Sequence, residues 1–190
     1  MAEDVLELLV AQHARIEELF RAVMAADGEQ RRDRFEELAR LLAVHETAEE
    51  EALHPVARRT IDAGPAVVDA RLAEERQAKE LLADLHERGV TAPDFPDQLQ
   101  QLRISVLEHA KREERYEFPR LRAHLDEATG RRLATALRAA EAVAPTRPHP
   151  GVETATANVV AAPALAVLDR IRDAVRAAVR GDETGTDGGR

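Results

Sequence analysis

The chain has 190 residues, one third of them charged, and its formal net charge is -9. It contains no cysteine, which excludes a disulfide framework, thiolate metal sites, iron–sulfur clusters and thiol catalysis. The acidic charge gives no indication of binding to nucleic acid or to an anionic membrane. Only 3% of the residues are aromatic, and Ala, Leu, Glu and Arg are abundant, which is typical of an all-α domain.

The apolar pattern predicts four long helices, over residues 3–26, 29–54, 66–88 and 97–124. Gly28 and Gly89 mark the ends of the first and third helices, and Pro55 marks the end of the second because proline cannot donate to the helical ladder. The connections are short. The sequence therefore predicts an up-down-up-down four-helix bundle, an architecture that builds metal sites from side chains on facing helices.

Beyond the bundle, the composition of the chain changes several times. We expect the bundle to cover residues 1–125, followed by a short accessory helix at 126–144 and a proline-rich linker at 145–163. An amphipathic helix follows at 164–180, and a tail expected to be disordered at 181–190. The amphipathic helix could dock on the bundle, on a second copy of the chain as a homodimer, or on a partner protein. No secretion signal or membrane-spanning run is evident, so we expect a cytoplasmic protein.

Polar residues interrupt the apolar stripes of two predicted helices at matching positions. His45 is followed by Glu49, and His109 is followed by Glu113. A spacing of four residues places each histidine and glutamate on one helical face, so both side chains can reach a single point. Burying ionisable groups is costly unless they are paired or bind an ion. These residues therefore predict a metal site, and His13 joins them from the apolar stripe of the first helix.

The third helix and the end of the second give weaker signals. Glu75 is the available carboxylate on the third helix, although Glu75 and Lys79 also fit an ordinary exposed ion pair. His54 follows His45 by nine residues, which on a regular helix places the two side chains about 180° apart. We expect His54 to reach the site only if the helix is distorted there or if the site lies near that end.

These residues resemble the hemerythrin HHE cation-binding family over roughly residues 8–119. The resemblance rests on the segments LLVAQHARIEELF, HETAEEEALHP, AEERQAKELLADL and LEHAKREERYEFPRL. It implies a non-haem di-iron centre in which two carboxylates bridge the irons and histidines cap each iron. Carried over position by position, it implies that the ligands are His13, His45, Glu49, His109 and Glu113, with Glu49 and Glu113 as the bridges.

The chain departs from the family pattern on the third helix. Members of the family usually have a histidine at the position of Glu75, and the oxygen carriers have another at the position of Lys79. Some related proteins have a ligating tyrosine at the position of His54, so His54 joins the candidate metal ligands, and Glu75 joins them as the available carboxylate of the third helix. Glu114 competes with Glu113 as the bridge, because oxygen carriers use a five-residue step from the histidine, but Glu113 fits the apolar stripe better.

A site with three or four histidines and three carboxylates is more anionic than the site of an oxygen carrier. Carboxylate oxygens favour ferric iron, which makes redox chemistry more favourable than reversible oxygen binding. We therefore expect a di-iron protein that reacts with O2, peroxide or NO, as an oxidase, a peroxidase or a catalase-like enzyme. The alternatives are a metal-binding, gas-sensing or iron-homeostasis module without turnover, and a structural site for zinc or manganese. We expect Tyr116, one turn after Glu113, to pack in the core.

Overall fold

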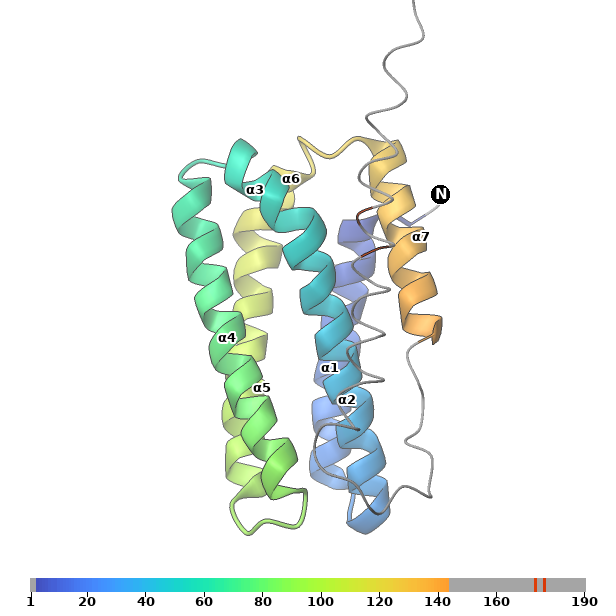
Figure 1. Cartoon of the computed structure of the whole chain (residues 1–190), viewed down its shortest axis with the longest axis vertical. Helices are drawn as coiled ribbons and strands as arrows, with labels where there is room; N and C mark the ends of the chain where they lie inside the picture. Colours follow the sequence, from blue (N-terminus) through green and yellow to red (C-terminus); the bar gives the residue numbers. More distant parts are fainter. Residues whose placement is uncertain (1–2, 144–172, 174–175, 177–190) are drawn as a thin grey trace, which may run out of the picture.

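The computed structural model describes residues 3–143 together with Asp173 and Arg176. Throughout this part of the chain the regular structure is helical, which confirms the predicted all-α fold (Figure 1). Four long helices form the bundle, namely α1 (Val5–Ala25), α2 (Gly28–Ala48), α4 (Gly64–Arg88) and α5 (Phe95–Arg112). A further helix, α7 (Glu127–Val143), packs against α1 and α2. Among the described residues, no helix is both long and apolar enough to cross a membrane.

Short local signals set where the helices begin. Asp4 and Glu7 form a capping box at the start of α1, in which the side chain of each residue accepts a hydrogen bond from the backbone N–H of the other. Pro65 and Pro96 stand in the first turns of α4 and α5, where the missing N–H of proline costs nothing. These caps allow the bundle helices to follow one another through short connections.

One wide π-helical turn directly follows each of α2 and α5. The turn η1 (Glu49–Leu53) joins α2 to α3 (His54–Thr60), and the turn η2 (Glu113–Glu117) joins α5 to α6 (Phe118–Leu121). In each turn, a backbone N–H bonds to the carbonyl five residues earlier, from His54 to Glu49 and from Phe118 to Glu113.

The prediction that the second helix ends at Pro55 was wrong, because the chain continues through the proline as α3. Proline lacks an N–H, and in a regular helix its ring would collide with the carbonyl four residues earlier. A wider turn just before the proline accommodates both effects and lets the helical path continue. Pro119 follows η2 in the same way.

The core consists of two apolar clusters with a polar layer between them. Along α1, Leu9 belongs to one cluster and Ile16 to the other, and His13 lies between them. Along the second bundle helix, Leu42 and Ala48 belong to different clusters, with His45 between them. The predicted metal ligands therefore lie in the middle of a packed core, where water has little access.

The segments predicted beyond the bundle are only partly described. Helix α7 lies within the predicted accessory segment, and Asp126 accepts a hydrogen bond from the backbone N–H of Thr129 at its start. The predicted linker (145–163) and tail (181–190) lie outside the described residues. Of the predicted amphipathic helix (164–180), only Asp173 and Arg176 are described, and both are helical.

Candidate metal centre

The structure brings all seven predicted ligands into one buried layer of the bundle. Every bundle helix contributes at least one of them, and all are at most 9% exposed: His13, His45, Glu49, His54, Glu75, His109 and Glu113. Their ligand atoms form two overlapping groups that could each hold a metal ion, one of His13, His45, Glu49 and Glu113, and one of Glu49, Glu75 and His109. Within each group the ligand atoms lie within 4.8 Å of one another.

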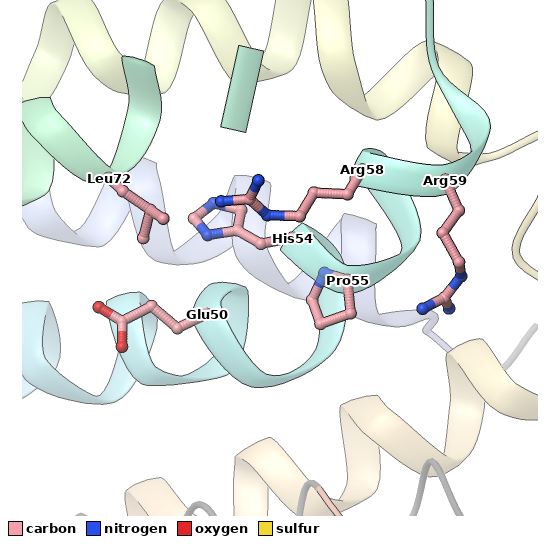
Figure 2. Close-up of a pocket in the computed structure, with 6 residues that line it drawn as sticks. All are labelled: Glu50, His54, Pro55, Arg58, Arg59 and Leu72. Atoms are coloured by element: carbon pink, nitrogen blue, oxygen red, sulfur yellow. The ribbon is translucent and has the colours of Figure 1, made fainter. Parts of the chain in front are cut away.

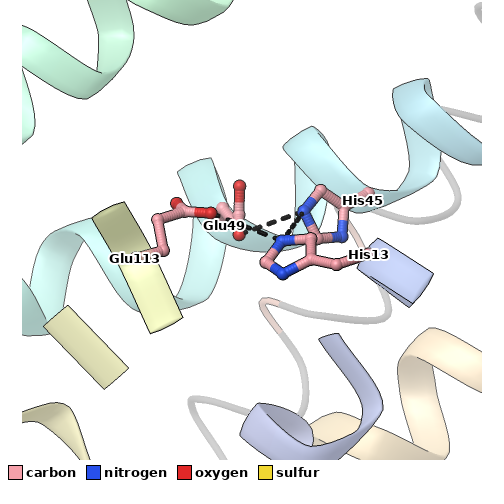
Figure 3. Close-up of side chains that lie close together, drawn as sticks. All are labelled: His13, His45, Glu49 and Glu113. Atoms are coloured by element: carbon pink, nitrogen blue, oxygen red, sulfur yellow. Dashed lines mark hydrogen bonds and ion pairs between the residues drawn. The ribbon is translucent and has the colours of Figure 1, made fainter. Parts of the chain in front are cut away.

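The first group joins α1 and α2 to both π-helical turns. The Nε2 atoms of His13 and His45 are 2.9 Å apart. His45 Nε2 lies 3.3 Å from Glu49 Oε1, and His13 Nε2 lies 3.4 Å from Glu113 Oε2. Figure 3 shows the two imidazole rings and the two carboxylates facing a common point. This is an arrangement in which four side chains could share one cation.

The second group lies toward α4 and α5. His109 Nε2 is 3.2 Å from Glu113 Oε1 and 3.9 Å from Glu49 Oε2. His54 Nε2 is 3.4 Å from Glu75 Oε1, which adds a second histidine to this side. Glu49 and Glu113 thus each direct one carboxylate oxygen toward each group. That is the placement expected of carboxylates that bridge two metal ions.

The π-helical turn η1 explains how His54 reaches the site. A single wide turn acts as a one-residue insertion, which changes the rotation of the following residues by about 100°. His54 therefore follows Glu49 as if it were four residues later, on the same face, rather than five. His54 was expected to reach the site only if the helix is distorted there or if the site lies near that end, and η1 is such a distortion.

Many polar atoms in this layer have no hydrogen-bond partner among the described residues. They include both carboxylate oxygens of Glu49 and Glu75, both ring nitrogens of His54, His109 Nε2 and Glu113 Oε2. An unsatisfied buried polar group costs about 1–3 kcal/mol, and more when it is charged. Such a cluster fits a cation well, because imidazole and carboxylate together suit iron, manganese and zinc.

The electrostatics of the layer also favour a cation. Without one, burial and the charge of Glu49 raise the pKa of Glu75 to about 9. Burial likewise raises the pKa of Glu46 and that of Glu117 to about 7. Burial opposes ionisation of His109, yet the neighbouring carboxylates of Glu113 and Glu49 raise its pKa to about 12. Glu75 therefore holds its proton at neutral pH where positive charge is lacking, whereas the burial of Glu49 is outweighed by the neighbouring histidines, which lower its pKa, and a bound metal ion would supply the charge that Glu75 lacks.

Three of the histidines are oriented by a polar partner on the ring nitrogen that faces away from the site. Nδ1 of His45 lies 2.8 Å from Gln12 Oε1, and Nδ1 of His13 lies 2.7 Å from Glu114 Oε1. Such partners accept a hydrogen bond from Nδ1–H, which keeps the proton on Nδ1 and leaves Nε2 free to bind a metal. Glu114 is therefore a partner of His13, with 41% of its side chain exposed, whereas Glu113 is buried and directed into the site.

Two of these orienting residues, Gln12 and Glu74, were not predicted from the sequence. Glu74 Oε2 lies 3.0 Å from His109 Nδ1, and the same carboxylate accepts hydrogen bonds from Arg71 and Arg112. Each missed residue directly precedes a predicted ligand in the sequence, His13 or Glu75. That position was the only available signal, since no fixed spacing links them to the histidines that they orient.

The expected packing of Tyr116 in the core was wrong, because this side chain is 53% exposed. The turn η2 shifts the inward face by one residue, so Glu117 takes the buried position and its Oε1 lies 3.2 Å from Arg71 Nε.

Lys79 does not form a simple exposed ion pair with Glu75. Its Nζ lies 4.0 Å from Glu75 and closer to Glu50, which accepts its hydrogen bond.

Comparison with known proteins agrees with this geometry. The model of the hemerythrin HHE cation-binding domain matches residues 4–121. The chain belongs to the hemerythrin HHE family. The matched region contains all seven buried candidate ligands, so this hemerythrin domain is a metal-binding domain whose His and Glu cluster fits that role.

A curated relative covers a large part of this hemerythrin-family chain. A protein named DNA nickase from Nostoc sp. (strain PCC 7120 / SAG 25.82 / UTEX 2576) is 26% identical over 139 residues, which are 73% of this chain and 39% of the relative. The chain thus spans well under half of that relative's length. No solved structure matched the chain.

Proposed function

We propose that this hemerythrin domain binds two non-haem iron ions and reacts with O2, peroxide or NO. The observation that supports it most strongly is the position of Glu49 and Glu113, whose two oxygens point to different ligand groups. A pair of iron ions supplies redox chemistry toward small oxygen- and nitrogen-containing molecules. Zinc and manganese accept the same donors and are the competing ions for the site.

The proposed ligand set differs between the two positions. His13 and His45 belong to one position, whereas His54, Glu75 and His109 belong to the other, and Glu49 and Glu113 are shared. The extra carboxylate makes the second position harder and more anionic. Because anionic oxygen ligands favour ferric iron, this position supports turnover rather than reversible oxygen carriage.

The surrounding residues control how a small molecule reaches this layer. Leu42 and Val106 are buried beside it and limit the access of water, whereas Leu72 is only half-buried. A pocket of about 330 Å³ opens on the side of His54, as Figure 2 shows. We propose that the reacting molecule approaches through this pocket, because His54 forms one of its walls and is also a member of the ligand set.

Anaerobic reconstitution with ferrous iron tests the proposal. We expect about two irons per chain, followed by repeated consumption of peroxide or O2 with a change in the optical spectrum. A stable, reversible absorption band without consumption would indicate a carrier or sensor instead. Iron binding well below two per chain, with tight binding of zinc, would contradict the di-iron proposal.

A sensing module is the second candidate function, and one ion pair favours it. The guanidinium group of Arg176 donates to both carboxylate oxygens of Glu51, at 2.9 and 3.1 Å. Glu51 lies in η1, between Glu49 and His54, so Arg176 contacts the turn that carries Glu49 and leads directly into His54. Sensing predicts that iron loading changes the proteolytic cleavage pattern of residues 144–190, and that peroxide is not turned over.

The partners expected from the sequence remain proposals on this second view. A second copy of the chain or a partner protein would bind to the segment 164–180. Light scattering with and without iron measures whether the chain forms a homodimer. DNA nicking is not proposed for this chain. Its net charge is -9, and it spans 39% of the relative that carries that name.

A further inference from the structure

We propose that the pocket beside His54 binds a small organic anion with an apolar body and a carboxylate head. This inference deepens the proposed function, on which it rests for the role of that anion as a ligand or substrate of the metal centre. Six residues line the pocket: Glu50, His54, Pro55, Arg58, Arg59 and Leu72.

The position of the pocket connects it to the candidate metal centre. His54 is itself a candidate ligand, Glu50 directly follows Glu49, and Leu72 lies one helical turn before Glu75 on α4. A molecule in the pocket therefore contacts the same three segments that hold one side of the ligand layer. Figure 2 shows the His54 ring between Leu72 and Pro55, with Arg58 extending from α3 toward that ring and Arg59 extending away from it.

The size of the pocket exceeds what a diatomic molecule or peroxide needs. Its volume is about 330 Å³, whereas a water molecule occupies about 30 Å³ of liquid. Pockets for organic ligands begin at about 300 Å³. Leu72, Pro55 and the faces of the His54 ring offer apolar contacts inside it. The pocket is therefore suited to a short hydrocarbon or aromatic body rather than to a gas molecule alone.

The charges at the pocket leave an excess of positive charge. Two arginines and one glutamate line the pocket, and that glutamate, Glu50, already accepts a hydrogen bond from Lys79, which also lies 3.4 Å from Glu46. Arg58 pairs with Asp69 at 2.6 Å, but both side chains are exposed, and such pairs contribute little. Arg59 has no ion-pair partner among the residues that the structure describes. Guanidinium groups bind carboxylates with paired hydrogen bonds, which favours a carboxylate head at this end of the pocket.

The test uses calorimetric titration of the full chain with octanoate, octanamide and acetate. Octanoate combines an eight-carbon body with a carboxylate, octanamide lacks the charge, and acetate lacks the body. We expect saturable binding of octanoate, and binding at least about tenfold weaker for each of the other two compounds. Failure of octanoate to bind, or equal affinity for octanamide, overturns the proposal.

Three double variants test where octanoate binds. The double variant Arg58→Gln with Arg59→Gln should weaken octanoate binding about tenfold, and the corresponding double change to lysine should restore part of it. The matched control is Arg115→Gln with Arg120→Gln, which removes the same charge from exposed arginines that do not line this pocket. An equal loss in the control variant overturns the proposal, because it would indicate nonspecific attraction. Circular dichroism confirms that each variant is folded.

These outcomes are independent of the redox chemistry. Octanoate binding is read without iron turnover, so its failure overturns the pocket inference alone. Failure of iron to bind at about two per chain overturns the proposed function and leaves the calorimetric result interpretable.

Discussion

Replacing Glu75 by glutamine should stabilise the metal-free protein while weakening its metal site. Burial and the charge of Glu49 raise the pKa of Glu75 from 4.5 to about 9 in the folded chain without a cation. A carboxyl group with a raised pKa opposes folding at every pH above its unfolded value, because the unfolded chain can ionise it and the folded chain cannot. Glutamine has nearly the same shape and no such cost.

The magnitude follows from the distance between the ordinary pKa and the working pH. In the unfolded chain Glu75 ionises above its ordinary pKa of 4.5, whereas in the folded chain it stays protonated up to a pKa of about 9. At pH 7 this difference has accumulated over 2.5 pH units, and each unit corresponds to about 1.4 kcal/mol. The substitution should therefore raise the free energy of unfolding by about 3 kcal/mol, or the melting temperature by roughly 6–12 °C. The gain should be absent below pH 4.5 and grow until about pH 9.

The assay is thermal and urea denaturation of the two metal-free proteins at pH values below, within and above this range. Repeating it with metal should reverse the order, because the wild-type carboxylate can bind the cation and glutamine binds it more weakly. A variant that is less stable than the wild type without metal at neutral pH would refute the reasoning. It would mean that Glu75 is stabilised by a partner other than a cation.

The remaining predictions concern the ligands and one backbone contact. Glu114→Ala should weaken iron binding by about 10–100-fold through loss of the partner of His13, whereas Glu113→Ala should reduce it further and lower the iron stoichiometry; equal losses would mean that the bridge is wrongly assigned. Glu75→His should shift the iron protein toward reversible oxygen binding, and an unchanged optical spectrum would exclude Glu75 as a ligand. Gly64→Ala should cost about 1–3 kcal/mol in urea unfolding, because its Cβ would stand 2.3 Å from the carbonyl oxygen of Ala57; an unaltered midpoint would refute this close approach.

The helical class and the centre of the site could be read from periodicity. His45 with Glu49 and His109 with Glu113 share a face because their spacing is close to one helical turn, and this holds wherever the helices lie in the molecule. Their position in an apolar stripe implied burial, and burial of such groups implied a cation. The same reasoning predicted the burial of His13, which lies between Leu9 and Ile16 in the stripe of α1 and is buried.

Other features depend on interactions that local spacing does not reveal. Gln12 and Glu74 orient histidines on other helices, and their contacts exist only after the bundle has packed. Glu117 is buried and Tyr116 is exposed because of η2, and a pattern based on the regular helical period does not predict this π-helical turn. Pattern analysis assumes a constant rotation per residue, and one wide turn is enough to change every position after it.

The sequence by itself therefore determined the four helices and the presence of a buried His and Glu cluster, because both depend on short-range spacing, and its resemblance to known segments indicated the family. Only the tertiary structure decided that His54 joins the cluster and that Glu49 and Glu113 each face two groups of ligands. The physical reasons are the π-helical turn η1, which rotates His54 onto the face of Glu49, and the packing of helices that are distant in sequence, which brings His45 and His109 to the same carboxylate.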